Sequence, residues 1–204
     1  MDKAGNEYNT VKIGSQWWMA ENLRTTKFSD GSAITYAASN AAWDSLTAGG
    51  YSFYDTKGRG YSTYSQETYG ALYNWHAVND SKGLCPSGWH VPRDDVTGGY
   101  SEWQTLENYL GPNAGTKLKT ISGWYNASGD FTNGGDYTSG FLGLPGGYRN
   151  TSGGFFVVGL SGYWWSASEY TTNAWFRILY YDNGVVVRYD ATKELGLSVR
   201  CLRD

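Results

Sequence analysis

The chain has 204 residues and a formal net charge of −3, with 28 Gly, 18 Tyr and 10 Trp but only 17% charged residues. It lacks a cluster of Lys and Arg, which argues against nucleic acid as a partner, because neutralising phosphates needs concentrated positive charge. No apolar run approaches the roughly 20 residues of a membrane helix, so we expect no membrane insertion of this domain. The length and the lack of a linker predict one domain over residues 1–204.

The first half of the chain predicts short elements joined by long loops. Residues 6–23 read as a β-hairpin, with β-favouring residues on both sides of a Gly14-Ser15 turn. Residues 37–46 predict a short helix with Asn40 as its cap. Residues 49–69 alternate Tyr with Gly, Ser and Lys, which is typical of a long ordered loop.

Two further helices are predicted in the middle of the chain. Apolar residues at helical spacing favour a helix over residues 69–78. A clearer helix begins after Ser101, because Gln104 stands three residues on, as in a capping box, and Gly111 and Pro112 end the pattern. Residues 115–147 then form a second long, Gly-rich and aromatic loop region, and loops of that length are usually functional or disordered. We expect an ordered, functional one.

Searches for catalytic groupings are mostly negative. The sequence has no GxSxG, P-loop, dinucleotide fingerprint or HExxH. Asp94-Asp95 could hold a structural calcium with neighbouring carbonyls, although a solvated turn or a capping pair is the simpler interpretation. No other cofactor is expected. Two cysteines, Cys85 and Cys201, allow either one disulfide or two buried free thiols.

The C-terminal part predicts a hairpin, because two β-rich runs, residues 174–182 and 185–190, flank Asn183-Gly184. Side chains alternate along a strand, so Trp175, Arg177, Leu179 and Tyr181 share one face. If that face packs on the core, the other face projects a largely apolar row into solvent. Exposing such a row is unfavourable in the absence of a partner, so the pattern favours a binding surface. Burial of both faces is the alternative. The outward row consists of Phe176, Ile178, Tyr180 and Asp182.

Loops rich in Tyr, Trp, Ser, Gly and Asn are also typical of recognition surfaces, since Tyr and Trp offer large contact area at low entropic cost. Trp124 and Tyr125, in the second loop region, are expected to aid binding.

Seven segments of the chain form a recognisable set: residues 11–23, 85–92, 102–103, 140–141, 144–149, 162–166 and 198–201. Together they resemble the Fibrobacter succinogenes major paralogous domain family. That resemblance implies an α+β, C-type-lectin-like fold with two helices, small twisted antiparallel sheets and long ordered loops. It also implies a disulfide between Cys85 and Cys201, and it argues against the related formylglycine-generating enzymes, which need further cysteines.

The last forty residues also resemble the variable region of proteins diversified by retroelements, in which a fixed frame carries randomised positions. The alternative is an ordinary, undiversified member of the family. The candidate variable and binding region is residues 162–204, and its ligand-binding positions would be Phe176, Ile178, Tyr180, Asp182, Val186, Tyr189, Asp190, Glu194 and Leu195.

These observations predict a non-enzymatic ligand-binding domain for receptor recognition or adhesion. Its partner would be a protein or glycan on another cell or surface. The expected location is extracytoplasmic: a bacterial cell surface, a secreted protein or a phage virion. A structural surface or pilus-type subunit is the main alternative, and an enzyme of the formylglycine-generating type is a weaker one.

Overall fold

The computed structural model describes residues 1–54, 66–95, 100–125 and 134–204. The predicted α+β class is confirmed, because short helices alternate with small sheets that are mostly antiparallel. Five helical segments occur among the described residues, where the sequence pattern predicted three and the family resemblance implied two. They are α1 (Asn40–Asp44), α2 (Gln66–Tyr69), α3 (Trp75–Val78), α4 (Glu102–Leu110) and α5 (Ala114–Leu118).

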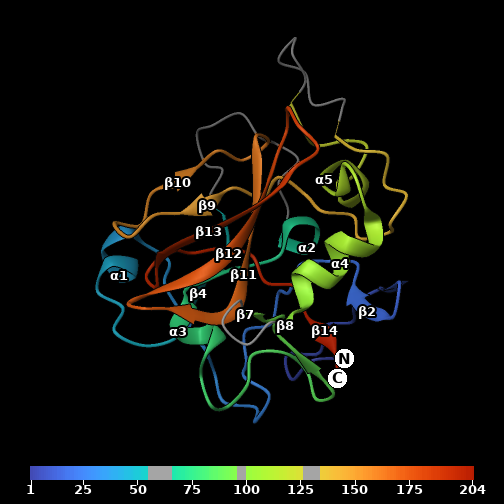
Figure 1. Cartoon of the computed structure of the whole chain (residues 1–204). Coiled ribbons are helices and arrows are strands. Elements are labelled where there is room, and N and C mark those ends of the chain that lie inside the picture. The colour runs from blue at the N-terminus through green and yellow to red at the C-terminus, as the bar shows by residue number, and fades with distance from the viewer. Residues whose placement is uncertain (55–65, 96–99, 126–133) are drawn as a thin grey trace.

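The central sheet has the order β11-β12-β13, with β11 (Ser161–Tyr170), β12 (Asn173–Tyr180) and β13 (Val186–Thr192). In Figure 1, α4 and α5 lie on one side of it, and β9 (Tyr148–Arg149) and β10 (Phe155–Phe156) lie on the other. A second sheet brings together β1 (Thr10–Ile13), β2 (Gln16–Met19), β14 (Leu202–Arg203) and β6 (Trp89–His90). The remaining strands are β3 (Thr35–Tyr36), β4 (Gly50–Ser52), β5 (Leu72–Tyr73), β7 (Asp94–Asp95) and β8 (Tyr100–Ser101).

Both predicted hairpins form. Val11 pairs with Trp18 across β1 and β2, and Leu179 pairs with Val186 across β12 and β13. Because β12 ends at Tyr180, the second connection covers residues 181–185 rather than the two-residue turn that Asn-Gly suggested.

Apolar clusters bury both faces of the central sheet. On one face, Phe176 and Ile178 join a cluster with Trp75 of α3. On the other face, Leu179 joins a cluster with Trp103 and Leu106 of α4. The sheet is therefore an interior layer over much of its area.

The helix predicted after Ser101 is confirmed as α4. The Ser101 hydroxyl accepts the Gln104 backbone N–H at 3.0 Å, and this bond satisfies one of the free amides at the start of a helix. Trp103 and Leu106 are buried on its inner face. Gly111 ends it with φ = 70°, a conformation that favours glycine.

Two other helix predictions need correction. α1 is shorter than residues 37–46, and Ser39, not Asn40, caps it by accepting the Ala42 N–H at 3.1 Å. The continuous helix over residues 69–78 was wrong. Gly70 takes φ = +75° and leaves no room for a side chain, because a Cβ there would lie 2.7 Å from Asn22 Cβ. The chain turns at Gly70, so β5 separates α2 from α3.

The two long loop predictions are partly met. β4 occupies the start of residues 49–69, and α5 occupies the start of residues 115–147. Most of the other described residues in these stretches lie outside regular elements. Residues 55–65 and 126–133 lie outside the described residues.

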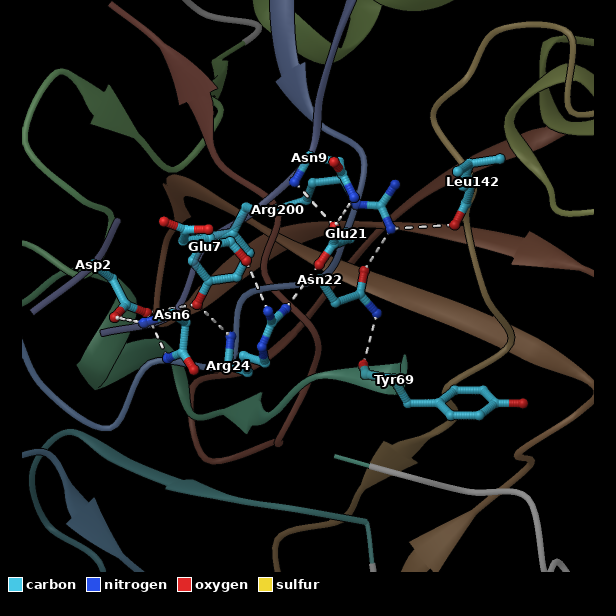
Figure 2. Close-up of polar contacts among 11 residues, drawn as sticks. Asp2, Asn6, Glu7, Asn9, Glu21, Asn22, Arg24, Tyr69, Leu142 and Arg200 are labelled. Carbon is cyan, nitrogen blue, oxygen red and sulfur yellow. Dashed lines mark hydrogen bonds and ion pairs between the residues drawn. The ribbon is translucent and has the colours of Figure 1, made fainter. Parts of the chain in front are cut away.

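The first and last parts of the chain are fastened to each other. The Leu202 strand residue pairs with Trp18, and Figure 1 shows both termini on the same side of the molecule. In Figure 2, Asn22 receives a hydrogen bond from Arg200 at 2.8 Å and donates one to the Tyr69 carbonyl at 2.9 Å. Burial lowers the pKa of Arg200 to about 9, and its guanidinium lies 4.0 Å from the centre of the Phe141 ring.

Cys85 and Cys201 form a disulfide with their Cα atoms 6.0 Å apart, so the free-thiol alternative was wrong. The bridge joins the segment before β6 to the segment before β14. Within the described part of the chain, none of the helices is both long and apolar enough to cross a membrane.

Candidate ligand-binding site

The apolar row predicted to project from β12 is mostly buried. Phe176 is 4% exposed and Ile178 is 5% exposed, because the α3 side of the sheet is as well covered as the α4 side. Tyr180, at the end of the strand, is partly exposed, and Asp182, which lies beyond the strand, is exposed. The alternative of two buried faces is therefore correct for most of β12. Strand period fixed which residues share a face but not which face meets water.

The opposite face carries a buried charge cluster. Arg177 donates to both carboxylate oxygens of Asp94, at 2.6 and 2.7 Å, and it also contacts Glu107 of α4. Arg188, on β13, lies 3.3 Å from the same Asp94 carboxylate and stacks 3.4 Å from the centre of the Trp175 ring. Two cations on neighbouring strands thus share one acidic residue, and this cluster joins β7 and α4 to the sheet.

This cluster also shows the surroundings of Asp94, for which a solvated turn, a capping pair or a calcium site was expected. Asp94 is fully buried, and Ser101 donates to it as well, so a cation would have to displace Arg177. Burial raises the pKa of Glu107, and Asp94 adds to that effect while Arg177 opposes it. The described residues contain no group of three His, Cys, Asp or Glu side chains that could hold a metal ion.

An aromatic surface remains open at the margin of the same sheet, on the Phe176 side. Tyr148 and Phe156 stack with ring centres 5.6 Å apart, and Tyr148 meets Tyr163 edge-on at 5.2 Å. Tyr189 packs against the buried Phe176 at 6.1 Å yet stays 62% exposed. We call this surface the aromatic face; it comprises Tyr148, Phe156, Tyr163, Tyr180, Val187 and Tyr189.

The aromatic face is electrically neutral. None of its six side chains carries a charge at physiological pH. Burial raises the pKa of Tyr163 to about 12, the neighbouring Tyr180 and Tyr148 add to the shift, and a hydrogen bond with Ser161 opposes it. The Tyr163 hydroxyl therefore stays protonated and can both donate and accept a hydrogen bond.

The tip of the β12–β13 hairpin borders this face and is held in place from α5. Lys119 directly follows α5 and donates to the carbonyls of Tyr180 and Asn183, each at 2.9 Å. Gly115 of α5 donates its backbone N–H to the Gly184 carbonyl at 2.9 Å. Burial lowers the pKa of Lys119, and Asp182 opposes that shift. The tip is thus preorganised rather than a free loop.

The other predicted positions are scattered. Trp124 is fully buried, so its predicted place on a binding surface was wrong, and its indole N–H bonds to Thr120 and Gly143. Val186 is also buried. The remaining positions lie around the sheet margin with some exposure: Tyr125, Asp182, Asp190, Glu194 and Leu195.

The structure adds four residues to the site that the strand pattern missed, and one of them, Val187, lies on β13. Tyr163 stands in the aromatic run that opens β11, while Tyr148 and Phe156 come from β9 and β10. Their aromatic character was visible in the sequence, but nothing there indicated that the β9–β10 pair packs beside β11.

Comparisons with known proteins gave one match. The model of the Fibrobacter succinogenes major domain matches residues 11–203. No curated protein and no solved structure matched the chain. Since the match covers nearly the whole chain, the protein belongs to the Fibrobacter succinogenes major domain family.

Proposed function

We propose that the chain is a non-enzymatic ligand-recognition domain and that the aromatic face is its binding surface. One observation carries this proposal: neutral rings, including the 62% exposed Tyr189 and the 41% exposed Phe156, stay open at the margin of an otherwise buried sheet. Exposed apolar surface of this kind is costly in a protein without a partner. The rings are held by strands and by a fixed hairpin tip, so little ordering is needed on binding.

The chemistry of the face favours a neutral ligand. Ring faces pack against apolar surface, while Tyr hydroxyls at the ring edges exchange hydrogen bonds with a partner. The apolar faces of sugar rings, surrounded by hydroxyls, match both properties. A neutral glycan on another cell or surface is therefore the first ligand class to test, and an uncharged protein surface is the second.

Tyr189→Ala tests the proposal. We expect affinity for a neutral polysaccharide to fall roughly tenfold or more, because central aromatic residues dominate binding energy. Retardation in gels containing neutral or anionic polysaccharides measures this. Tyr109→Ala is the matched control, since Tyr109 is 66% exposed but lies on α4. Equal losses from both variants would contradict the proposed site, and binding of the anionic polymers alone would contradict a neutral ligand.

We also propose an extracytoplasmic location and a C-type-lectin-like architecture. The Cys85–Cys201 disulfide supports the location, because disulfides persist in oxidising compartments. The pairing of β2 with β14, which joins the two ends of the chain, together with small sheets and irregular connections, supports the architecture.

We also propose diversification by a retroelement, but at fewer positions than the sequence suggested. Phe176, Ile178 and Val186 are buried, so varying them would disturb packing rather than change a surface. Varied positions would be confined to exposed or half-exposed residues such as Tyr180 and Tyr189. The encoding DNA tests this, since it should carry a neighbouring near-repeat that differs only at adenines; its absence would contradict diversification and leave the binding surface unaffected.

A further inference from the structure

The outer edge of β13 has backbone groups that point away from the sheet. Tyr181 donates its backbone N–H to Leu160, on the β11 side. Alternate residues of a strand bond to opposite neighbours, so Ile178 and Phe176 bond toward β13. Their partners there are Val187 and Tyr189. The N–H and C=O groups of the alternate residues in β13 therefore point outward; these residues are Val186, Arg188 and Asp190.

This edge is open. β13 stands at the end of the three-stranded order, and no described residue forms a hydrogen bond with the outward backbone groups of Val186, Arg188 or Asp190. A cleft of about 400 Å³ lies between the Val186 end of the strand and residues of α4 and α5 such as Glu107 and Ala114. Free strand edges of this kind pair readily with another strand.

Arg188 and Asp190 each retain one charged atom without a hydrogen bond to any described residue. Arg188 uses Nη2 to donate to the Asp94 carbonyl at 3.0 Å, while its Nη1 bonds to no described residue. Asp190 accepts from Asn173 through Oδ2 at 2.7 Å, while its Oδ1 has no described partner. The two residues are both half-buried and lie on the same side of the strand, two positions apart.

The charges of Arg188 and Asp190 favour one register for antiparallel pairing of this edge with the same edge of a second copy. Antiparallel pairing about Arg188 would place Arg188 directly opposite Arg188 of the other copy, and like charges in that position repel. Pairing about Tyr189 instead places Arg188 opposite Asp190 twice, by symmetry. We infer that β13 pairs with β13 of a second copy about Tyr189, forming a dimer with a continuous six-stranded sheet.

In this register the outward backbone groups of Arg188 and Asp190 face one another, while Val186 lies opposite Thr192, whose carbonyl already accepts the Leu195 backbone N–H at 3.2 Å. Tyr189 of the two copies would stand in a non-hydrogen-bonded pair, with Cα atoms about 4.5 Å apart. The dimer therefore joins two aromatic faces side by side. The inference rests on the strand edge and not on the proposed function, so it holds or fails independently of ligand binding.

Asp190→Arg tests the pairing. The substitution places Arg opposite Arg188 in both halves, and we expect the dimer dissociation constant to rise about tenfold or more. Sedimentation velocity from roughly 10 µM to 1 mM measures it. Glu194→Arg makes the same change of charge at an exposed residue outside the strand and should leave the dimer intact. A monomeric wild type over this range, or a dimer that survives Asp190→Arg, would overturn the inference.

Hydrogen exchange on the wild-type protein gives a test that needs no variant. The amides of Arg188 and Asp190 should exchange more slowly as concentration rises, while those of Val187 and Tyr189, which bond within the sheet, should change little. A dimer without slower exchange at Arg188 and Asp190 would overturn this interface.

Discussion

Arg177 shows how single residues decide which parts of the sheet are interior. It is 3% exposed, and its charge is tolerated because Asp94 and Glu107 lie against it. A buried charge that loses its partner is strongly destabilising, whereas exposed ion pairs contribute little. The stability of this region should therefore depend on these two carboxylates, and most on Asp94, which accepts two hydrogen bonds from Arg177.

Asp94→Asn should lower the free energy of unfolding by about 3 kcal/mol, the lower end of the usual range, because Glu107 still contacts Arg177. Urea denaturation measures this. Glu169→Gln is the control: Glu169 is 53% exposed where it pairs with Lys193, so its loss should cost about 1 kcal/mol or less. Equal losses of unfolding free energy in the two variants would show that the buried cluster stabilises the fold no more than an exposed ion pair does.

His90 links pH to stability. It contacts Glu102 at 2.9 Å and Asp204 at 2.6 Å. The hydrogen bond with Glu102 raises the pKa of His90, that with Asp204 adds to the rise, and burial opposes it. Protonated His90 is therefore favoured in the folded state, so its stabilising contribution is complete below the usual 6.5 and is lost as pH rises through the raised value.

Accordingly, wild-type protein should be more stable than His90→Gln at acidic pH, and the difference should shrink above pH 6.5. Urea denaturation of both proteins on either side of that pH measures it. A difference that grows with pH would mean that neutral His90 is the favoured form.

At the scale of elements, the hairpin tip is the part whose order depends on a single side chain. Lys119→Met removes the donor for the Tyr180 and Asn183 carbonyls and leaves those groups without that partner. We expect residues 181–185 to exchange backbone hydrogens faster, because local opening costs less when such bonds are lost. Mass spectrometry of exchange measures this, and unchanged exchange at the tip would show that α5 does not hold it.

Elements whose ends are determined by neighbouring residues could be predicted from the sequence. Elements whose ends depend on contacts with distant residues could not. α4 followed from Ser101, Gln104 and Gly111, which act within a few residues of one another. The break between α2 and α3 could not be predicted, because Asn22, far away in sequence, leaves no space for a side chain at Gly70. For the same reason, alternation identified the two faces of β12 but not the clusters that cover both.

At the scale of the molecule, the disulfide should contribute much of the stability. It closes a separation of 116 residues, which in the chain-entropy model corresponds to about 4–5 kcal/mol. Reduction should therefore lower the free energy of unfolding by about that amount, as measured by urea denaturation with and without reductant. A Cys85→Ala/Cys201→Ala variant should be insensitive to reductant; if the reduced wild type matches the oxidised one, the bridge is not stabilising.

The candidate site shows the same limit of prediction at this scale. The sequence located the C-terminal hairpin and placed Tyr180 and Tyr189 among the candidate binding positions. It did not predict that β9 and β10 would bring Tyr148 and Phe156 beside them, since that placement depends on how separate small sheets pack together.

The same disulfide limits how far the molecule lengthens when its two ends are pulled apart. The segment between Cys85 and Cys201 is bypassed by the covalent bridge and bears no extending load. Only the residues before Cys85 and the few after Cys201 can unravel, to about 300 Å of extended chain at most. The central sheet and its aromatic rings lie within the bypassed segment, so a load applied to the two ends does not pass along their backbone.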